Sequence, residues 1–154
     1  MKILSLVNKL NKNFSSCLFR PALQSWNYSS LYGSQLNIND VKPFFKDQED
    51  SEFTKLEIYK NESYTMYLMR WGAGYTYPEH YHENQRCLLK VIEGELEETR
   101  FSNEETTKYN LSNGGVAYID DTLGSHSVFN TTNNYTYSLH MYYEYNYKLA
   151  KLDN

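Results

Sequence analysis

The chain has 154 residues, 40% hydrophobic residues and a formal net charge of −4. This length fits one domain, and the acidic balance excludes the sustained basic surface that binds nucleic acid or anionic membranes. The two cysteines, Cys17 and Cys87, form neither a disulfide framework nor a C-x-x-C motif, and no apolar run approaches the roughly 20 residues that span a bilayer. We therefore expect a cytoplasmic monomer whose partners are small molecules.

The N-terminal segment predicts a surface helix. Apolar residues recur there at helical spacing: Ile3, Leu6, Val7, Leu10 and Phe14. The same stretch has no acidic residue before Asp40, so residues 1–30 also fit an organellar presequence. Both interpretations stay open at this point.

A second short helix is expected from Asn39, which can cap it, to about Lys46, with Pro43 tolerated in the first turn. The charged stretch 47–52 then predicts a solvent-exposed loop. We therefore divide the single domain into an N-terminal helical segment, residues 1–52, that packs on a barrel formed by residues 53–154.

The chain becomes rich in Tyr, Thr, Val and Leu after this loop, which predicts β-structure. The expected strands cover residues 53–59, 64–71, 86–92, 95–101, 106–111, 115–119, 125–130 and 135–143. Turn signals such as Glu93-Gly94 and Asn113-Gly114 separate them. Many short strands of this kind are typical of an antiparallel sandwich or barrel with one small site in its mouth.

Histidines are few and informatively placed. His80 and His82 are two residues apart, so both side chains point to one face of an extended segment and can share one metal ion. His126 begins a later strand after a glycine-containing turn, and His140 lies in the last predicted strand.

The spacing around these histidines resembles the two motifs of the cupin family. The residues that reproduce the first motif are Gly74, His80, His82, Cys87 and Gly94, with the cysteine where that motif usually has a glutamate ligand. Those that resemble the second are Gly115, Asp121, His126 and Asn130, with the aspartate in the place of a proline. The resemblance implies a mainly β cupin barrel, an antiparallel jelly roll, with short N-terminal helices.

Within the cupins, the chain resembles the cysteine dioxygenase family from about residue 53 to residue 142. The matching segments are 71–74, the histidine pair with the cysteine five residues beyond it, 117–121, 124–126 and 138–142. The resemblance implies three sets of roles. Its Fe(II) ligands would be His80, His82 and His126, its thioether pair Cys87 and Tyr142, and the residues that orient the tyrosine Ser138 and His140.

The implied reaction adds both atoms of O2 to the sulfur of cysteine, in cysteine catabolism and taurine biosynthesis. Three neutral imidazoles without a carboxylate leave a divalent metal with its full charge and with open positions for an anionic thiol and O2. Imidazoles bind zinc or copper more tightly than Fe(II), so the choice of iron comes from the resemblance.

Two local expectations concern the strands beside the metal. We expect His140 to hydrogen-bond the Tyr142 hydroxyl, because alternate residues of a strand share a face. We also expect the chain between Glu83 and Arg86 to bend, because otherwise Cys87 would face away from the histidines.

The family's carboxylate-binding arginine, in an early Tyr-Thr-Arg segment, corresponds here to Lys55 in Phe53-Thr54-Lys55. We therefore predict that Lys55 binds the substrate, with Arg70 as the alternative. Lysine lacks the planar two-point fork of arginine, so dioxygenation of 3-mercaptopropionate or cysteamine stays an alternative. A non-catalytic cupin that binds metal or ligand, and a zinc hydrolase, also stay open.

Overall fold

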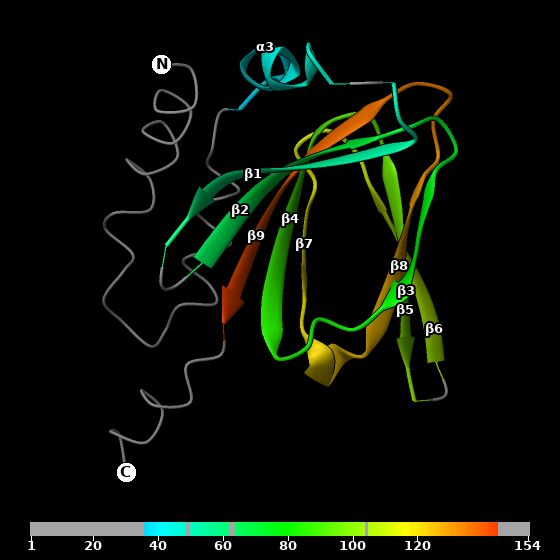
Figure 1. Cartoon of the computed structure of the whole chain (residues 1–154). Helices are drawn as coiled ribbons and strands as arrows, with labels where there is room; N and C mark the ends of the chain where they lie inside the picture. The colour runs from blue at the N-terminus through cyan, green and yellow to red at the C-terminus, as the bar shows by residue number, and fades with distance from the viewer. Residues whose placement is uncertain (1–35, 49, 62–63, 104, 145–154) are drawn as a thin grey trace.

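The computed structural model describes residues 36–48, 50–61, 64–103 and 105–144. Two antiparallel β-sheets face each other in this part of the chain, with a short helix at one end (Figure 1). The predicted N-terminal helix and the alternative presequence of residues 1–30 lie outside the described residues. No helix within these ranges is both long and apolar enough to cross a membrane.

The short helix differs from the prediction in its cap. Helix α3 (Ile38–Val41) continues into a 3-10 turn, η1 (Lys42–Phe45), and is capped by Asn37. The Asn37 side chain accepts a hydrogen bond from the backbone of Asn39, and Asp40 accepts one from the backbone of Asn37. The expected cap, Asn39, is wrong because this reciprocal pair satisfies the first free N–H groups from a position nearer the N-terminus.

The larger sheet has the strand order β1-β2-β9-β4-β7, and the smaller sheet has the order β3-β8-β5-β6. The larger sheet contains β1 (Phe53–Lys60), β2 (Tyr64–Trp71), β9 (Thr136–Glu144), β4 (Gln85–Glu93) and β7 (Val116–Ile119). The smaller contains β3 (Thr76–His80), β8 (Ser125–Asn130), β5 (Leu96–Ser102) and β6 (Glu105–Leu111). All eight predicted strands are confirmed to within one residue at each end.

Strand β3 was not predicted from the sequence. It contains Pro78 and has no alternating apolar pattern, and most of its side chains are exposed or only partly buried. It forms because it is an edge strand that pairs with β8, and its register shifts between Tyr77 and His80, where the proline lies. An edge strand tolerates a proline because one side of its backbone needs no ladder partner.

Two apolar clusters lie on opposite faces of the larger sheet. The outer cluster includes Met66 and Leu68 of β2 and also Val41 and Phe45 from the α3–η1 segment. The inner cluster, between the sheets, includes Trp71. This alternation along β2 determines which of its residues reach the space between the sheets.

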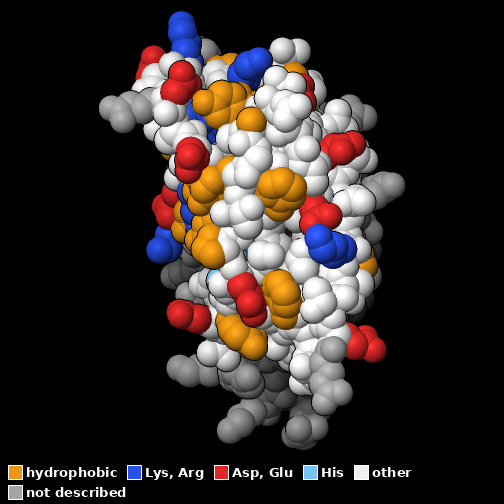
Figure 2. Space-filling model, turned by 90° about the vertical axis from the view of Figure 1, so that its right-hand side faces the viewer, with side chains coloured by type: hydrophobic (Ala, Val, Ile, Leu, Met, Phe, Trp, Pro, Cys, Tyr) orange, Lys and Arg blue, Asp and Glu red, His pale blue; other side chains and the backbone are white. Residues whose placement is uncertain are grey.

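The surface over the smaller sheet has a mixed charge. On the side shown in Figure 2, Lys and Arg side chains are dispersed among Asp and Glu side chains, with hydrophobic side chains between them. This agrees with the modest net charge of −4.

Candidate metal centre

Three histidines converge in the space between the two sheets. His80 ends β3, His126 lies opposite it in the register of β8, and His82 follows two residues after His80. Their ring centroids are 4.6–5.1 Å apart, and their ligand atoms all lie within 4.8 Å of one another. The structure therefore brings together the three predicted ligands on elements from two different sequence motifs.

The hydrogen bonds of His80 and His126 fix which ring nitrogen is free. Nδ1 of His80 lies 2.9 Å from the carbonyl oxygen of Pro78, and Nδ1 of His126 lies 2.8 Å from Oε1 of Glu98. Both partners only accept, so each Nδ1 carries the hydrogen and each Nε2 carries a lone pair. These two Nε2 atoms face each other at 3.2 Å. Two facing lone pairs repel each other unless a proton or a metal ion bridges them.

His82 completes the same pattern because its ring has no hydrogen bond. Both of its ring nitrogens are buried and without a partner among the described residues, which is costly unless something else binds them. Burial lowers the pKa of His82 to about 4, with smaller contributions from His126 and His80. The imidazole is therefore neutral at physiological pH, as a metal ligand must be.

These observations fit one metal ion better than an empty polar cavity. Imidazole nitrogens bound at right angles to one ion about 2.1 Å away are about 3 Å apart, which is close to the Nε2–Nε2 separation observed here. Burial also lowers the pKa of His80, partly opposed by its hydrogen bond to Pro78. The three side chains are therefore the residues that would hold the ion.

Glu98 is a site residue that the sequence reasoning missed. It is 2% exposed, accepts a hydrogen bond from His126, and is 2.9 Å from Nη2 of Arg100. Burial alone would raise the pKa of the Glu98 carboxyl, but the hydrogen bonds from His126 and Arg100 outweigh burial and lower that pKa. An ionised carboxylate behind His126 fixes the imidazole and increases its basicity toward a metal.

The expected bend before Cys87 is present. Glu83 and Asn84 have φ angles of 48° and 67°, and the chain passes there from the smaller sheet to β4 of the larger one. Cys87 then lies directly opposite Tyr142 in the β4–β9 register. Burial raises the pKa of Cys87 to about 12, although a hydrogen bond with Tyr142 opposes the rise. The cysteine is therefore a neutral thiol beside the tyrosine.

A chain of buried hydrogen bonds leads from Trp71 to Cys87. The indole Nε1 of Trp71 is 2.8 Å from Oγ of Ser138, which in turn is 2.9 Å from Nε2 of His140. The indole donates to the hydroxyl of Ser138, which has both a hydrogen and a second lone pair for Nε2. The serine contact is therefore compatible with the His140 hydrogen on either Nε2 or Nδ1. That Nδ1 lies 3.8 Å from Sγ of Cys87.

The expected hydrogen bond from His140 to the Tyr142 hydroxyl is therefore not what the structure shows. Ser138, His140 and Tyr142 do share a face of β9, but the imidazole and phenol rings are stacked, with centroids 6.3 Å apart. Both ring nitrogens of His140 have other partners, namely Ser138 and Cys87. The partner of Nδ1 is Cys87 on the neighbouring strand rather than the phenol.

The two candidates for substrate binding lie on different faces of the larger sheet. Nζ of Lys55 is 4.2 Å from the ring centroid of Tyr67 and 4.8 Å from that of Tyr142. The residue as a whole is exposed, yet partial burial of its ammonium lowers its pKa, opposed by Cys87. Lys55 thus extends along the rim of the site.

Arg70 faces the opposite way. Its guanidinium carbon lies 5.6 Å from the ring centroid of Phe45 and 4.8 Å from that of Tyr135, and its Nη2 is 3.3 Å from Oγ1 of Thr54. Arg70 has the same parity on β2 as the outer apolar cluster. It therefore does not reach the histidines.

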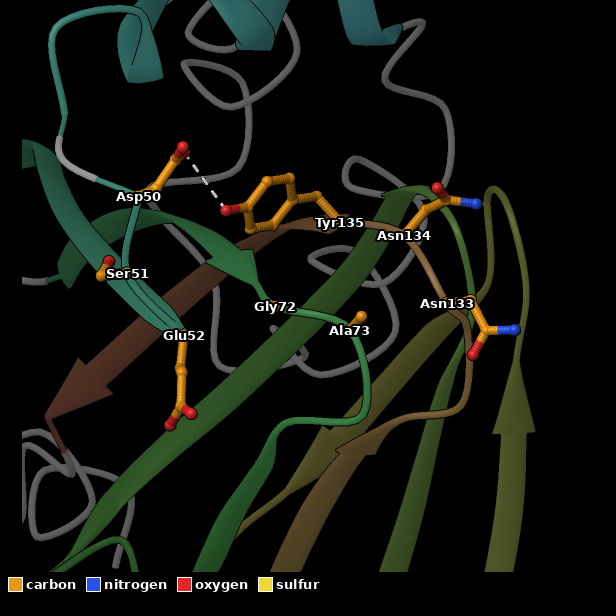
Figure 3. Close-up of a pocket in the computed structure, with 8 residues that line it drawn as sticks. All are labelled: Asp50, Ser51, Glu52, Gly72, Ala73, Asn133, Asn134 and Tyr135. Atoms are coloured by element: carbon orange, nitrogen blue, oxygen red, sulfur yellow. Dashed lines mark hydrogen bonds between the residues drawn. The ribbon is translucent and has the colours of Figure 1, made fainter.

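A separate pocket of about 370 Å³ lies where β2 ends and where β8 turns into β9. Its lining comes from the segment before β1 and from these two loops (Figure 3). The Tyr135 hydroxyl donates there to Asp50 at 3.3 Å. None of the eight lining residues is a predicted site residue.

Comparison with known proteins supports the family and the fold. The family model described as cysteine dioxygenase type I matches residues 32–153. Human cysteine dioxygenase type 1 is 29% identical over 133 residues, which cover 71% of this chain and 66% of the human protein. The chain thus aligns with slightly less than two thirds of the length of this relative.

Solved structures of low sequence identity share the fold. The cupin domain of Cnp3 from Schizosaccharomyces pombe has a TM-score of 0.57 at 14% identity, covering 66% of this chain and 67% of that one. A cupin superfamily protein from Desulfitobacterium hafniense has a TM-score of 0.55 at 12% identity, covering 68% and 88%. The predicted cupin fold is therefore confirmed.

Proposed function

Because this chain belongs to the cysteine dioxygenase type I family, we propose that it is an iron-dependent thiol dioxygenase that converts cysteine and O2 to cysteine sulfinate. The convergence of His80, His82 and His126, with two free Nε2 atoms facing each other, is the observation that supports it best. The usual fourth ligand of a cupin is replaced by Cys87, a neutral thiol, which leaves room for an anionic substrate.

Bound iron would supply a common binding point for the thiolate and for O2. The chain's own residues then hold the substrate. The Lys55 ammonium, which lies over the Tyr142 ring, can pair with the substrate carboxylate. The buried ring of Tyr142 stacks on that of His82, so its phenol would lie close to a thiol bound at the metal. Burial raises the pKa of Tyr142 well above its ordinary value, as does the neighbouring Cys87, so the phenol keeps its hydrogen and can donate it. Cytoplasmic location and a monomeric state are part of the same proposal.

Metal analysis combined with oxygen uptake tests this proposal. We expect the purified protein to contain substoichiometric iron and to consume one O2 for each cysteine sulfinate formed, because both oxygen atoms enter the product. Zinc in place of iron with hydrolysis but no oxygen uptake would favour a hydrolase. Metal without any turnover of cysteine, 3-mercaptopropionate or cysteamine would favour a non-catalytic cupin.

Substrate choice depends on Lys55. We expect Lys55→Ala to raise the KM for cysteine by roughly 10-fold, the factor that corresponds to about 1.4 kcal/mol, and to change the KM for cysteamine little. Cysteamine has no carboxylate, so it loses no ion pair. Steady-state oxygen uptake with both thiols measures the difference.

The matched control is Lys60→Ala, which removes an exposed lysine from the same strand and should change neither KM. Equal effects of Lys55→Ala on the two thiols would mean that this lysine does not bind the carboxylate. A thiol without a carboxylate would then be the better substrate candidate.

A further inference from the structure

One carboxylate outside the histidine cluster binds the loop that connects His82 to Cys87. Asp121 begins the 3-10 turn η2 (Asp121–Leu123). Its Oδ1 accepts a hydrogen bond from the backbone N–H of His82 at 2.7 Å, and its Oδ2 accepts one from that of Asn84, also at 2.7 Å. Both carboxylate oxygens therefore accept hydrogen bonds from the backbone of one short loop, which lies nearly forty positions away in the sequence.

This loop has a backbone conformation that needs external support. The N–H of Gln85 donates to the carbonyl of His82 at 2.9 Å, which closes a four-residue turn. Its two central residues, Glu83 and Asn84, both have positive φ angles, as in a type I′ turn. Glutamate is unfavourable in the left-handed region, so the turn is not specified by local preference alone.

His82 depends on this backbone more than the other two histidines do. The ring of His80 is anchored by the carbonyl of Pro78, and the ring of His126 by Glu98. The ring of His82 has no hydrogen-bonded partner among the described residues. Its direction is therefore set by packing against neighbouring rings and by the position of its own backbone, which is where Asp121 binds.

We infer that Asp121 is a positioning residue of the metal centre, which directs His82 toward the ion by binding the backbone of the 82–85 turn. The inference rests on the proposed metal site. It requires a carboxylate, because an asparagine at this position can accept through one atom only and would place an N–H group against the second backbone N–H.

The test is Asp121→Asn, with Co(II) titrated into the metal-free protein as a spectroscopic probe. We expect the dissociation constant for Co(II) to rise about 10- to 100-fold, the range found when a group that orients a metal ligand is removed. Amide hydrogen exchange should become faster at His82 and Asn84, while the amides of β4 and β9 keep their protection and show that the variant is folded.

Asp120→Asn is the matched control. Asp120 caps η2 by accepting at Oδ1 from the backbone and the hydroxyl of Thr122, and its Oδ2 accepts from the hydroxyl of Tyr118. Asparagine caps equally well, and a hydroxyl, unlike a backbone N–H, can also accept from the new amide, so Co(II) affinity should stay as in the wild type. Wild-type affinity in folded Asp121→Asn would overturn the inference and leave the metal centre intact. Absence of Co(II) binding by the wild type would instead overturn the metal centre, and the inference with it.

Discussion

Replacement of any one of the three clustered histidines by alanine is expected to abolish both iron binding and thiol oxidation. His80, His82 and His126 are the described His, Cys, Asp and Glu residues whose ligand atoms converge on one point. Two remaining imidazoles cannot hold Fe(II) against water, since imidazole sites bind this ion weakly. Iron content after reconstitution and oxygen uptake with cysteine measure the two losses separately.

The fourth histidine provides the matched control. His140 is as buried as its neighbours, but it hydrogen-bonds Ser138 and lies outside the cluster. His140→Ala should therefore keep its iron while oxidising cysteine more slowly. Full iron retention by His80→Ala, His82→Ala or His126→Ala would remove that residue from the ligand set. Loss of iron from His140→Ala would mean that His140 also contributes to iron binding.

Most of the fold could be predicted because strand formation here follows local pattern. Strands β2 and β8 have the alternating or apolar sequences and the flanking turns that define their ends, and both were predicted with their observed bounds. Strand β3 could not be predicted because its stability comes from pairing with β8 rather than from its own side chains. The helix cap was misplaced by two residues although its signal is local, because Asp40 lies three residues after Asn37 and closes a capping box with it.

The clustering of the three histidines was predictable for a different reason. The spacing of His80 and His82 is local, and the spacing to Cys87 and His126 repeats a pattern that belongs to a known fold. The roles of Glu98 and Asp121 depend on contacts across sheets and loops, which the spacing of the histidines does not reveal. One signal was available, because Glu98 has the same strand parity as the buried Leu96 and so predicts a buried charge.

The same parity rule separates the two basic candidates. Arg70 shares the parity of Met66 and Leu68, which pack in the outer apolar cluster, whereas Trp71 has the other parity and faces the site. Once the face of β2 that carries Trp71 was known, the strand parity in the sequence could therefore have ruled out Arg70 as a substrate-binding residue. Lys55 could not be placed in this way, because its contact with Tyr142 crosses from β1 to β9 over the intervening β2.

The second large expected effect is a covalent bond between Cys87 and Tyr142. The two residues are directly opposite on β4 and β9, and side chains in such positions start only about 5 Å apart at Cβ. Burial raises the pKa of Cys87 to about 12, so the thiol stays protonated. Forming a C–S bond from the S–H group and a ring C–H group removes two electrons and two protons, so the link requires an oxidant. Bound iron would supply the redox chemistry for this step, with O2 accepting the two electrons and two protons.

Incubation with Fe(II), O2 and cysteine should therefore produce a species lighter by two hydrogens that migrates faster on a denaturing gel. Cys87→Ser should not form it, because the variant has no sulfur, and Tyr142→Phe should not if oxidation of the phenol is required. Wild-type protein incubated without O2 should also stay unlinked. Mass spectrometry of the peptides that contain residues 87 and 142 decides the matter. If both peptides remain linear and unmodified while sulfinate accumulates, the cross-link is wrong, and the dioxygenase proposal then rests on the three histidines alone.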